Sequence, residues 1–253
     1  MAENIELKNN LNSFRDTFRN YSDYYTLIGG TACMILMEEA GRDFRATKDV
    51  DMILIMEDGG KDFCETFWEY ILQGKYTCGW KDSGPHYYRF TDPMPGYPSQ
   101  IELFSKRSDF EIDSRIIPIH IDEDVSSLSA IALDEDFYAF MKVGRRVVDG
   151  ISVLGAEYII PFKMYAWINN SELKKQGETV NSDDIKKHKN DVFRLVPLIN
   201  PDIRVKTEGN VRSTVSSFIA RMETENVADE FLFNGRTKEE TLSLLGEIYL
   251  YEE

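Results

Sequence analysis

The pattern of apolar and polar positions alternates between strand-like and helix-like segments along the first half of the chain. Short apolar or β-branched runs predict five strands, at residues 24–28, 50–56, 86–91, 100–104 and 116–121. Segments without helix breakers predict three helices, at residues 10–21, 31–39 and 63–72. Residues 147–153 predict a tight hairpin, because Asp149 and Gly150 separate two short apolar runs.

The second half of the chain changes character and reads as helical. Four further helices are predicted, at residues 156–169, 183–196, 211–223 and 237–249. Residues 174–182 are polar and contain a glycine, which favours a mobile loop. We therefore predict an α+β (mixed α/β) fold in two domains, an α/β domain over residues 1–155 and a helical C-terminal domain over residues 156–253.

Composition narrows the class of protein. The 253 residues are 42% hydrophobic and 29% charged, as is typical of a soluble globular protein. We expect neither a signal peptide nor a membrane span, and three cysteines without metal-type spacing favour a reducing, cytoplasmic location. With 44 acidic against 29 basic residues, the net charge of −15 excludes an extended basic groove for nucleic acid and docking on anionic lipid.

Two glycines interrupt the chain where a predicted strand passes into a predicted helix. Gly29 and Gly30 stand at this junction and are followed by Thr31. Glycines there let backbone N–H groups approach an anion, the helix N-terminus adds partial positive charge, and Thr31 is able to cap the helix. An ordinary strand–helix turn is the alternative and, for two glycines taken alone, the more common one.

A pair of aspartates stands at the start of an apolar strand. Asp49 and Asp51 are two residues apart, so their side chains share one face of that strand. Two neighbouring carboxylates repel each other, and a hard divalent cation such as Mg²⁺ resolves the conflict. A solvated strand end is the alternative. We favour the metal site because the run that follows has the apolar character of a central strand.

A third acid, Glu102, lies inside the apolar run 100–104. If that strand is next to the strand of Asp49 and Asp51, Glu102 completes a set of three carboxylates. Such a set holds one or two Mg²⁺ ions, which clamp a triphosphate and activate a hydroxyl for in-line attack. A glutamate at a strand edge that points to solvent is the alternative.

The order of these motifs resembles a known family. The run Gly29-Gly30-Thr31, then Arg45-Ala46-Thr47-Lys48-Asp49-Val50-Asp51, then Glu102 is similar to the polymerase-β-like nucleotidyltransferase superfamily. It is more similar still to the AbiEii/AbiGii-type nucleotidyltransferases, which include toxins of type IV toxin–antitoxin systems. The resemblance implies a mixed sheet flanked by helices, Mg²⁺, an NTP substrate and, for a toxin, a cognate antitoxin. Arg45 and Thr47 then contact phosphate, although Arg45 alternatively only neutralises local acid.

The resemblance also implies a lysine and an aspartate in the helical half, and Lys163 and Asp191 match them. Relatives often carry a second acid after the aspartate, where this chain has Arg194. Lys163 has apolar neighbours one helical turn away, namely Ile159, Ile160, Ala166 and Trp167. Such a lysine either snorkels to solvent or has a buried anionic partner, and we favour the partner because a phosphate site is predicted nearby. For Asp191 the alternative is a solvated helix with surface charge pairs.

These observations predict transfer of an NMP from an NTP to an acceptor hydroxyl. The acceptor stays open among tRNA, a protein and a small molecule such as an antibiotic. The net charge argues against a long nucleic acid as the acceptor, whereas the basic run at residues 186–189 is compatible with tRNA. A non-catalytic module that binds NTP or a toxin–antitoxin partner is the competing hypothesis.

Overall fold

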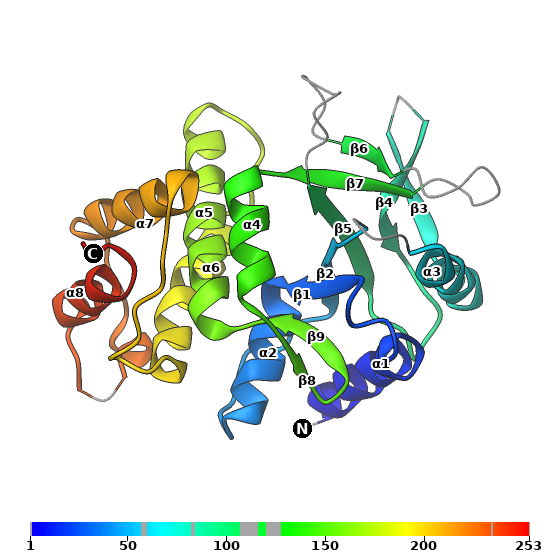
Figure 1. Ribbon diagram of the computed structural model, residues 1–253, viewed down its shortest axis with the longest axis horizontal. Helices are drawn as coiled ribbons and strands as arrows, with labels where there is room; N and C mark the ends of the chain where they lie inside the picture. The colour runs from blue at the N-terminus through cyan, green and yellow to red at the C-terminus, as the bar shows by residue number, and fades with distance from the viewer. Residues whose placement is uncertain are drawn as a thin grey trace. The chain divides into compact units, whose positions relative to one another are not determined.

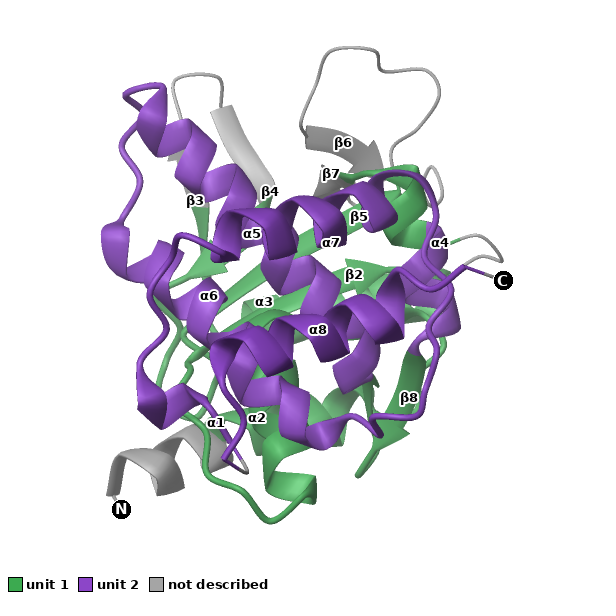
Figure 2. Ribbon diagram, turned by 90° about the vertical axis from the view of Figure 1, so that its left-hand side faces the viewer, with its two compact units in different colours: residues 1–138, 145–154 green, residues 139–144, 155–253 purple. Residues whose placement is uncertain are grey.

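A computed structural model describes residues 2–56, 60–81, 84–106, 116–119, 128–233 and 235–252 (Figure 1). It has the predicted α+β fold class, with a mixed sheet and helices around it. The chain forms two compact units, coloured in Figure 2. The first unit comprises residues 1–138 and 145–154, and the second comprises 139–144 and 155–253. The division into an α/β domain over residues 1–155 and a helical domain over residues 156–253 stays a prediction.

The sheet belongs to the first unit and brings distant segments together. Its strands among the described residues are β1 Tyr25–Ile28, β2 Asp49–Leu54, β3 Thr77–Lys81, β4 Gly84–Thr91, β5 Gln100–Lys106, β6 Ile116–Ile119, β7 Leu128–Leu133, β8 Arg145–Val148 and β9 Ile151–Leu154. They run in the order β3-β4-β5-β2-β1-β9-β8, and β7 pairs with both β5 and β6. The pairs β2–β5, β1–β9 and β5–β7 are parallel, whereas the other pairs are antiparallel. The strand pair β2–β5 therefore lies at the centre of the sheet.

The helices complete the two units. Those in the first half of the chain are α1 Ala2–Phe18, α2 Gly29–Glu39, α3 Lys61–Gln73 and α4 Glu135–Val143, the last of which contributes residues to both units. The second unit contains α5 Ala156–Lys175, α6 Ser182–Leu195, α7 Gly209–Met222 and α8 Lys238–Tyr249, with short 3₁₀ turns η1 Val196–Leu198 and η2 Asp229–Phe231. Within the described residues, no helix combines the length and the apolarity that a membrane span needs.

Aromatic side chains hold the first unit together. Residues from α1, β1 and α3 meet without any exposure to solvent, namely Phe14, Phe18, Tyr25, Phe63 and Phe67. Their rings lie within 4.6–6.2 Å of one another, centroid to centroid, in tilted, edge-on and stacked pairs. Such rings bury large apolar areas and prefer these geometries. This cluster fixes β1 and, with it, the start of α2.

The second unit has a core of its own. Trp167 on α5 packs edge-on against Phe218 on α7 with centroids 5.3 Å apart, and Phe193 on α6 lies 6.4 Å from the same ring. Helix α8 adds further fully buried side chains, among them Leu245 and Ile248. Helices α5 and α6 thus both pack against Phe218 of α7.

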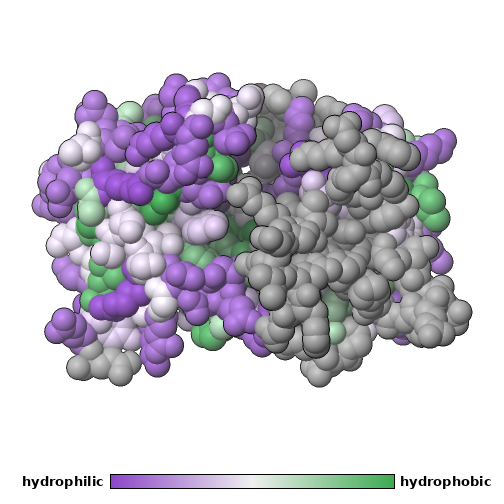
Figure 3. Space-filling model, turned by 90° about the horizontal axis from the view of Figure 1, so that it is seen from above, coloured by the Kyte–Doolittle hydropathy of each residue, from purple (hydrophilic) through white to green (hydrophobic). Residues whose placement is uncertain are grey.

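Most of the predicted elements are confirmed, with shifted ends. The hairpin at residues 147–153 is present as β8 and β9. Strands β3 and β7 and helix α4 were not predicted. The proposed loop at residues 174–182 is shorter than expected, because α5 extends to Lys175 and α6 begins at Ser182. Hydrophilic residues cover much of the coloured part of the face in Figure 3, in keeping with a charged share of 29%.

Candidate functional site

The turn from β1 into α2 requires both of its glycines. Gly29 has a φ of +72°, which disfavours residues with a Cβ. A Cβ built there would lie 1.8 Å from Oδ2 of Asp51, and a Cβ on Gly30 would lie 2.6 Å from Oγ1 of Thr47. The side chains of two predicted site residues therefore lie directly against the glycine backbone.

The N-terminus of α2 has no side-chain cap from its N-cap residue. That residue is Ile28, whose side chain accepts no hydrogen bond, and the first turn contains no acid. The prediction that Thr31 caps the helix is wrong. Its hydroxyl lies within α2 and donates a 2.5 Å hydrogen bond to the carbonyl oxygen of Asp49. The bond ties the helix to β2, and the partial positive charge of the helix start is left without an anionic cap from its own first turn.

The condition for a set of three carboxylates, that their two strands are neighbours, is met. Strands β2 and β5 run parallel, with Asp51 opposite Glu102 and Asp49 opposite Gln100. Residues opposite each other on neighbouring strands are about 4.8 Å apart along the sheet and project to the same face. Asp49 is exposed, and Asp51 is half-buried. The sheet thus brings the three acids to one face, although they come from segments about fifty residues apart in the sequence.

Glu102 does not point freely into solvent, because its side chain is only 12% exposed. Arg89 on β4 stands opposite it in the register, and two nitrogens of its guanidinium contact the same carboxylate oxygen, Oε1. Sequence reasoning missed Arg89, since only the pairing of β4 with β5 brings it to Glu102. Over the described ranges, no three acid, cysteine or histidine side chains converge as a metal cluster. The donor chemistry and the shared face suit a hard cation, but the three carboxylates do not converge.

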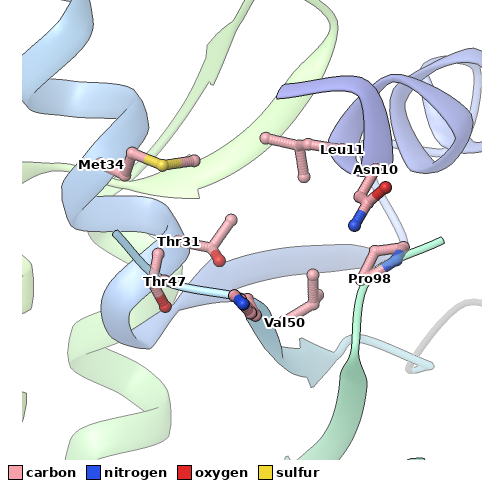
Figure 4. Close-up of a pocket in the computed structure, with 8 residues that line it drawn as sticks. Asn10, Leu11, Thr31, Met34, Thr47, Val50 and Pro98 are labelled. Atoms are coloured by element: carbon pink, nitrogen blue, oxygen red, sulfur yellow. The ribbon is translucent and has the colours of Figure 1, made fainter. Parts of the chain in front are cut away.

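Two more predicted residues lie at the start of α2. The position of a Cβ on Gly30 falls near Thr47 and 3.5 Å from Nη2 of Arg45. Thr47 also lines a shallow pocket, whose empty space of about 230 Å³ includes open solvent (Figure 4). Its lining comes from α1, α2, the segment leading into β2, β2 itself and the loop before β5: Asn10, Leu11, Thr31, Met34, Thr47, Lys48, Val50 and Pro98. Contact of Arg45 and Thr47 with a phosphate stays a prediction.

The two predicted residues of the helical half form a buried ion pair within the second unit. Nζ of Lys163 on α5 lies 3.3 Å from Oδ2 of Asp191 on α6, and their side chains are 4% and 0% exposed. Lys163 therefore has an anionic partner instead of snorkelling, and Asp191 is not a solvated surface residue. Arg194, at the position where the family pattern has an acid, places Nη1 3.6 Å from Oδ1 of Asp191.

The basic run at residues 186–189 is neutralised within the same unit. Nζ of Lys187 lies 2.9 Å from Asp184, and Nζ of Lys186 lies 3.6 Å from Asp183. Lys189 reaches Glu225 at 3.0 Å. Each lysine of the run has an acidic partner, so the run does not form a patch of unbalanced positive charge. tRNA as the acceptor stays a prediction.

Comparisons with known proteins add little. No family model matches the chain, and none of the curated proteins matches it. Among solved structures, the chain is similar to the antibiotic-resistance factor ANT(2'')-Ia, whose structure was determined in solution. That similarity has a TM-score of 0.35 and 13% sequence identity, and covers 79% of this chain and 84% of the other. The interpretation of the site therefore rests on its own residues.

Proposed function

We propose that the protein is a Mg²⁺-dependent nucleotidyltransferase that moves an NMP from an NTP to an acceptor hydroxyl. The observation that carries the proposal is the contact between Gly29 and the carboxylate of Asp51 at the start of α2. A helix N-terminus attracts an anion, whereas a carboxylate at the same place repels one. A phosphate with a bound cation suits both groups, because the phosphate faces the helix N-terminus and the cation faces the carboxylate. A metal–triphosphate complex carries both charges.

The residues divide into two roles in this proposal. The phosphates would be held by backbone and side-chain donors at the glycine turn, namely Gly29, Gly30, Thr31, Arg45 and Thr47. One or two Mg²⁺ ions would be held by Asp49, Asp51 and Glu102, whose carboxylates would have to draw together around the cation when it binds. When bound, the metal would neutralise charge on the phosphates and favour in-line attack of the acceptor hydroxyl at the α-phosphorus, with release of pyrophosphate.

The pairing of Glu102 with Arg89 is compatible with this role. Both contacts from the guanidinium go to Oε1, so Arg89 does not engage Oε2. A carboxylate with two oxygens is able to serve an arginine and a cation together. Arg89 would then orient Glu102 in the way that outer-shell partners orient metal ligands.

For the helical half, we propose that Lys163 stabilises charge on the phosphates and that Asp191 orients or deprotonates the acceptor. The support is their burial and their shared ion pair, because buried charges that are not needed for packing are costly to keep. A purely structural pair is the alternative. Substitution separates the two roles: loss of a purely structural pair lowers stability, whereas loss of a catalytic pair also lowers the activity of the protein that remains folded.

The acceptor is the least constrained part of the proposal. The paired lysines at residues 186–189 and the net charge of −15 favour a small molecule or a protein over a long RNA. A small-molecule acceptor, as in antibiotic modification, is therefore our second proposal beside the toxin of a type IV toxin–antitoxin system. We expect either to act in the cytoplasm.

The test is incubation of the protein with each labelled NTP and Mg²⁺ in the presence of total tRNA, aminoglycosides or cell protein. We expect label on one class of acceptor, and loss of that label in Asp51→Asn. Asp202 is exposed and makes no ion pair within the part of the chain that the structure describes, so Asp202→Asn provides a control with the same loss of one charge. Mg²⁺-dependent NTP binding without transfer to any acceptor would favour the non-catalytic module, and absence of both would reject the site.

A further inference from the structure

A row of charged groups crosses the sheet at the level of the proposed metal ligands. The strand register places Arg89 of β4 opposite Glu102 of β5, and Glu102 opposite Asp51 of β2. Asp51 in turn stands opposite Ile28, the last residue of β1 before α2 begins. Residues opposite each other on neighbouring strands project to the same face of a sheet, about 4.8 Å apart. A cation, two carboxylates and the N-terminus of α2 therefore follow one another across neighbouring strands (Figure 1).

The two ends of this row are positive, and its middle is negative. At one end, two guanidinium nitrogens of Arg89 contact Oε1 of Glu102. At the other end, the first turn of α2 contains no acid, and Nη2 of Arg45 lies 3.5 Å from the position of a Cβ on Gly30. The helix N-terminus and this guanidinium both add positive charge there. The row thus has the charge order that a cation flanked by phosphates would complement.

The arginine has opposite effects on two ligands of such a site. A free divalent cation is repelled by Arg89, because both carry positive charge. A complex of a divalent cation with a triphosphate is attracted by Arg89, because the phosphates carry more negative charge than the cation offsets. A site that held only a free cation would therefore lose affinity through an arginine on one of its carboxylates. The same arginine favours a site that binds the cation together with a triphosphate.

We propose that Arg89 makes the site bind a complex of a divalent cation with NTP in preference to the free cation. The inference rests on the proposed function and gives Arg89 a role beyond the orientation of Glu102. Its charge offsets one of the three carboxylates, so the site without nucleotide binds a free cation weakly. The carboxylates do not converge as a metal cluster within the described ranges, and they would draw together when the complex binds.

The test uses Mn²⁺ as the probe, because electron paramagnetic resonance counts the free ion directly. Binding is measured with Mn²⁺ alone and with Mn²⁺ plus the α,β-methylene analogue of each NTP, whose methylene bridge resists nucleotidyl transfer. The binding that Asp51→Asn removes defines the site against other acids of the surface. Arg89→Gln takes away the charge and keeps an amide that is able to donate to Glu102.

Arg89→Gln should shift the two affinities in opposite directions. We expect Mn²⁺ alone to bind about threefold more tightly, and the complex of Mn²⁺ with the analogue to bind about threefold more weakly. Arg89→Lys keeps the charge and should keep the preference of the wild type. Arg146→Gln is the matched control, since Arg146 on β8 pairs with Glu39 at the far end of the sheet, and its side chain is 48% exposed against 50% for Arg89. It should change neither affinity.

The outcomes separate this inference from the proposed function. Two affinities that move in the same direction in Arg89→Gln would show that the arginine only orients Glu102. Unchanged affinities would show that its charge has no effect, and either result overturns the inference while the proposed function stands. Absence of Asp51-dependent binding in the wild type would overturn both. Should Arg89→Gln fail to fold, Arg89→Thr removes the same charge with a residue that suits a strand.

Discussion

Replacement of Gly29 by alanine perturbs the proposed site at its tightest contact. The added methyl group would begin 1.8 Å from Oδ2 and 2.7 Å from Cγ of Asp51, a separation that must grow to at least 3.0 Å. The backbone φ of +72° adds a cost of about 1–2 kcal/mol for any residue with a Cβ. The free energy of unfolding should therefore fall by more than that backbone cost, and Asp51 should be displaced from the start of α2.

The chain provides a matched control for this substitution at the other end of the same helix. Gly41 has a φ of +66°, but a Cβ there would meet nothing within 4 Å. Gly41→Ala should therefore carry the backbone cost alone, about 1–2 kcal/mol. The difference between the two variants in chemical denaturation isolates the contact with Asp51.

A double variant and a binding assay complete the experiment. Asp51→Ala removes the oxygen with which the new methyl group of Gly29→Ala would clash. The two substitutions together should therefore destabilise the protein less than the sum of their separate effects. Calorimetry should show that Gly29→Ala abolishes Mg²⁺-dependent NTP binding, whereas Gly41→Ala retains it. Equal destabilisation of the two glycine variants, with NTP binding intact in both, would refute the reasoning about this contact.

Three further predictions concern the rest of the molecule. Lys163→Met should lower the free energy of unfolding by about 3–5 kcal/mol in urea denaturation, because it removes a partner from the buried Asp191. Burial raises the pKa of the Cys64 thiol to about 12, so this thiol should resist a disulfide reagent at pH 8 until the protein unfolds. The Arg221 side chain lowers the pKa of Glu172, so that the stability from this carboxylate is present above its ordinary pKa of 4.5 and is lost as pH falls through the lowered value. Glu172→Gln should therefore weaken the acid dependence of thermal unfolding below pH 4.5.

Each of these predictions has a result that contradicts it. A Lys163→Met protein as stable as the wild type would show that Asp191 does not depend on the lysine, whereas Lys163→Met with Asp191→Leu should recover part of the loss. Rapid labelling of Cys64 in the folded protein, located by peptide mapping, would contradict its burial. An unchanged acid limb in Glu172→Gln would show that its contact with Arg221 does not contribute in solution.

The order of elements and the carboxylate face were accessible from the sequence for a physical reason. The apolar run after Asp51 and the run around Glu102 each have the composition of a buried strand. That the two strands are neighbours was only a condition of the sequence argument, and the structure meets it. The glycine pair marked the junction of strand and helix because only a missing side chain permits such an approach. The sequence did not indicate that the side chains approaching the glycines would be those of Asp51 and Thr47.

The features that escaped prediction depend on contacts between segments far apart in the chain. Arg89 is one of several arginines in the sequence, and only the register of β4 against β5 pairs it with Glu102. Lys163 was expected to meet a phosphate, and its pairing with Asp191 was not foreseen, because the packing of α5 on α6 brings the two side chains together. Thr31 was predicted to cap α2, but its hydroxyl donates a hydrogen bond to the carbonyl oxygen of Asp49 instead.

The central claim is that the protein transfers a nucleotidyl group, and one paired assay tests it most directly. The wild type and Asp51→Asn are incubated with Mg²⁺, the panel of acceptors and an NTP labelled either at the α- or at the γ-phosphate. We predict that the wild type places the α-label on an acceptor and releases the γ-label as pyrophosphate, and that Asp51→Asn does neither. Transfer of the γ-label to an acceptor, or no transfer of either label with any of the four nucleotides, would contradict the account.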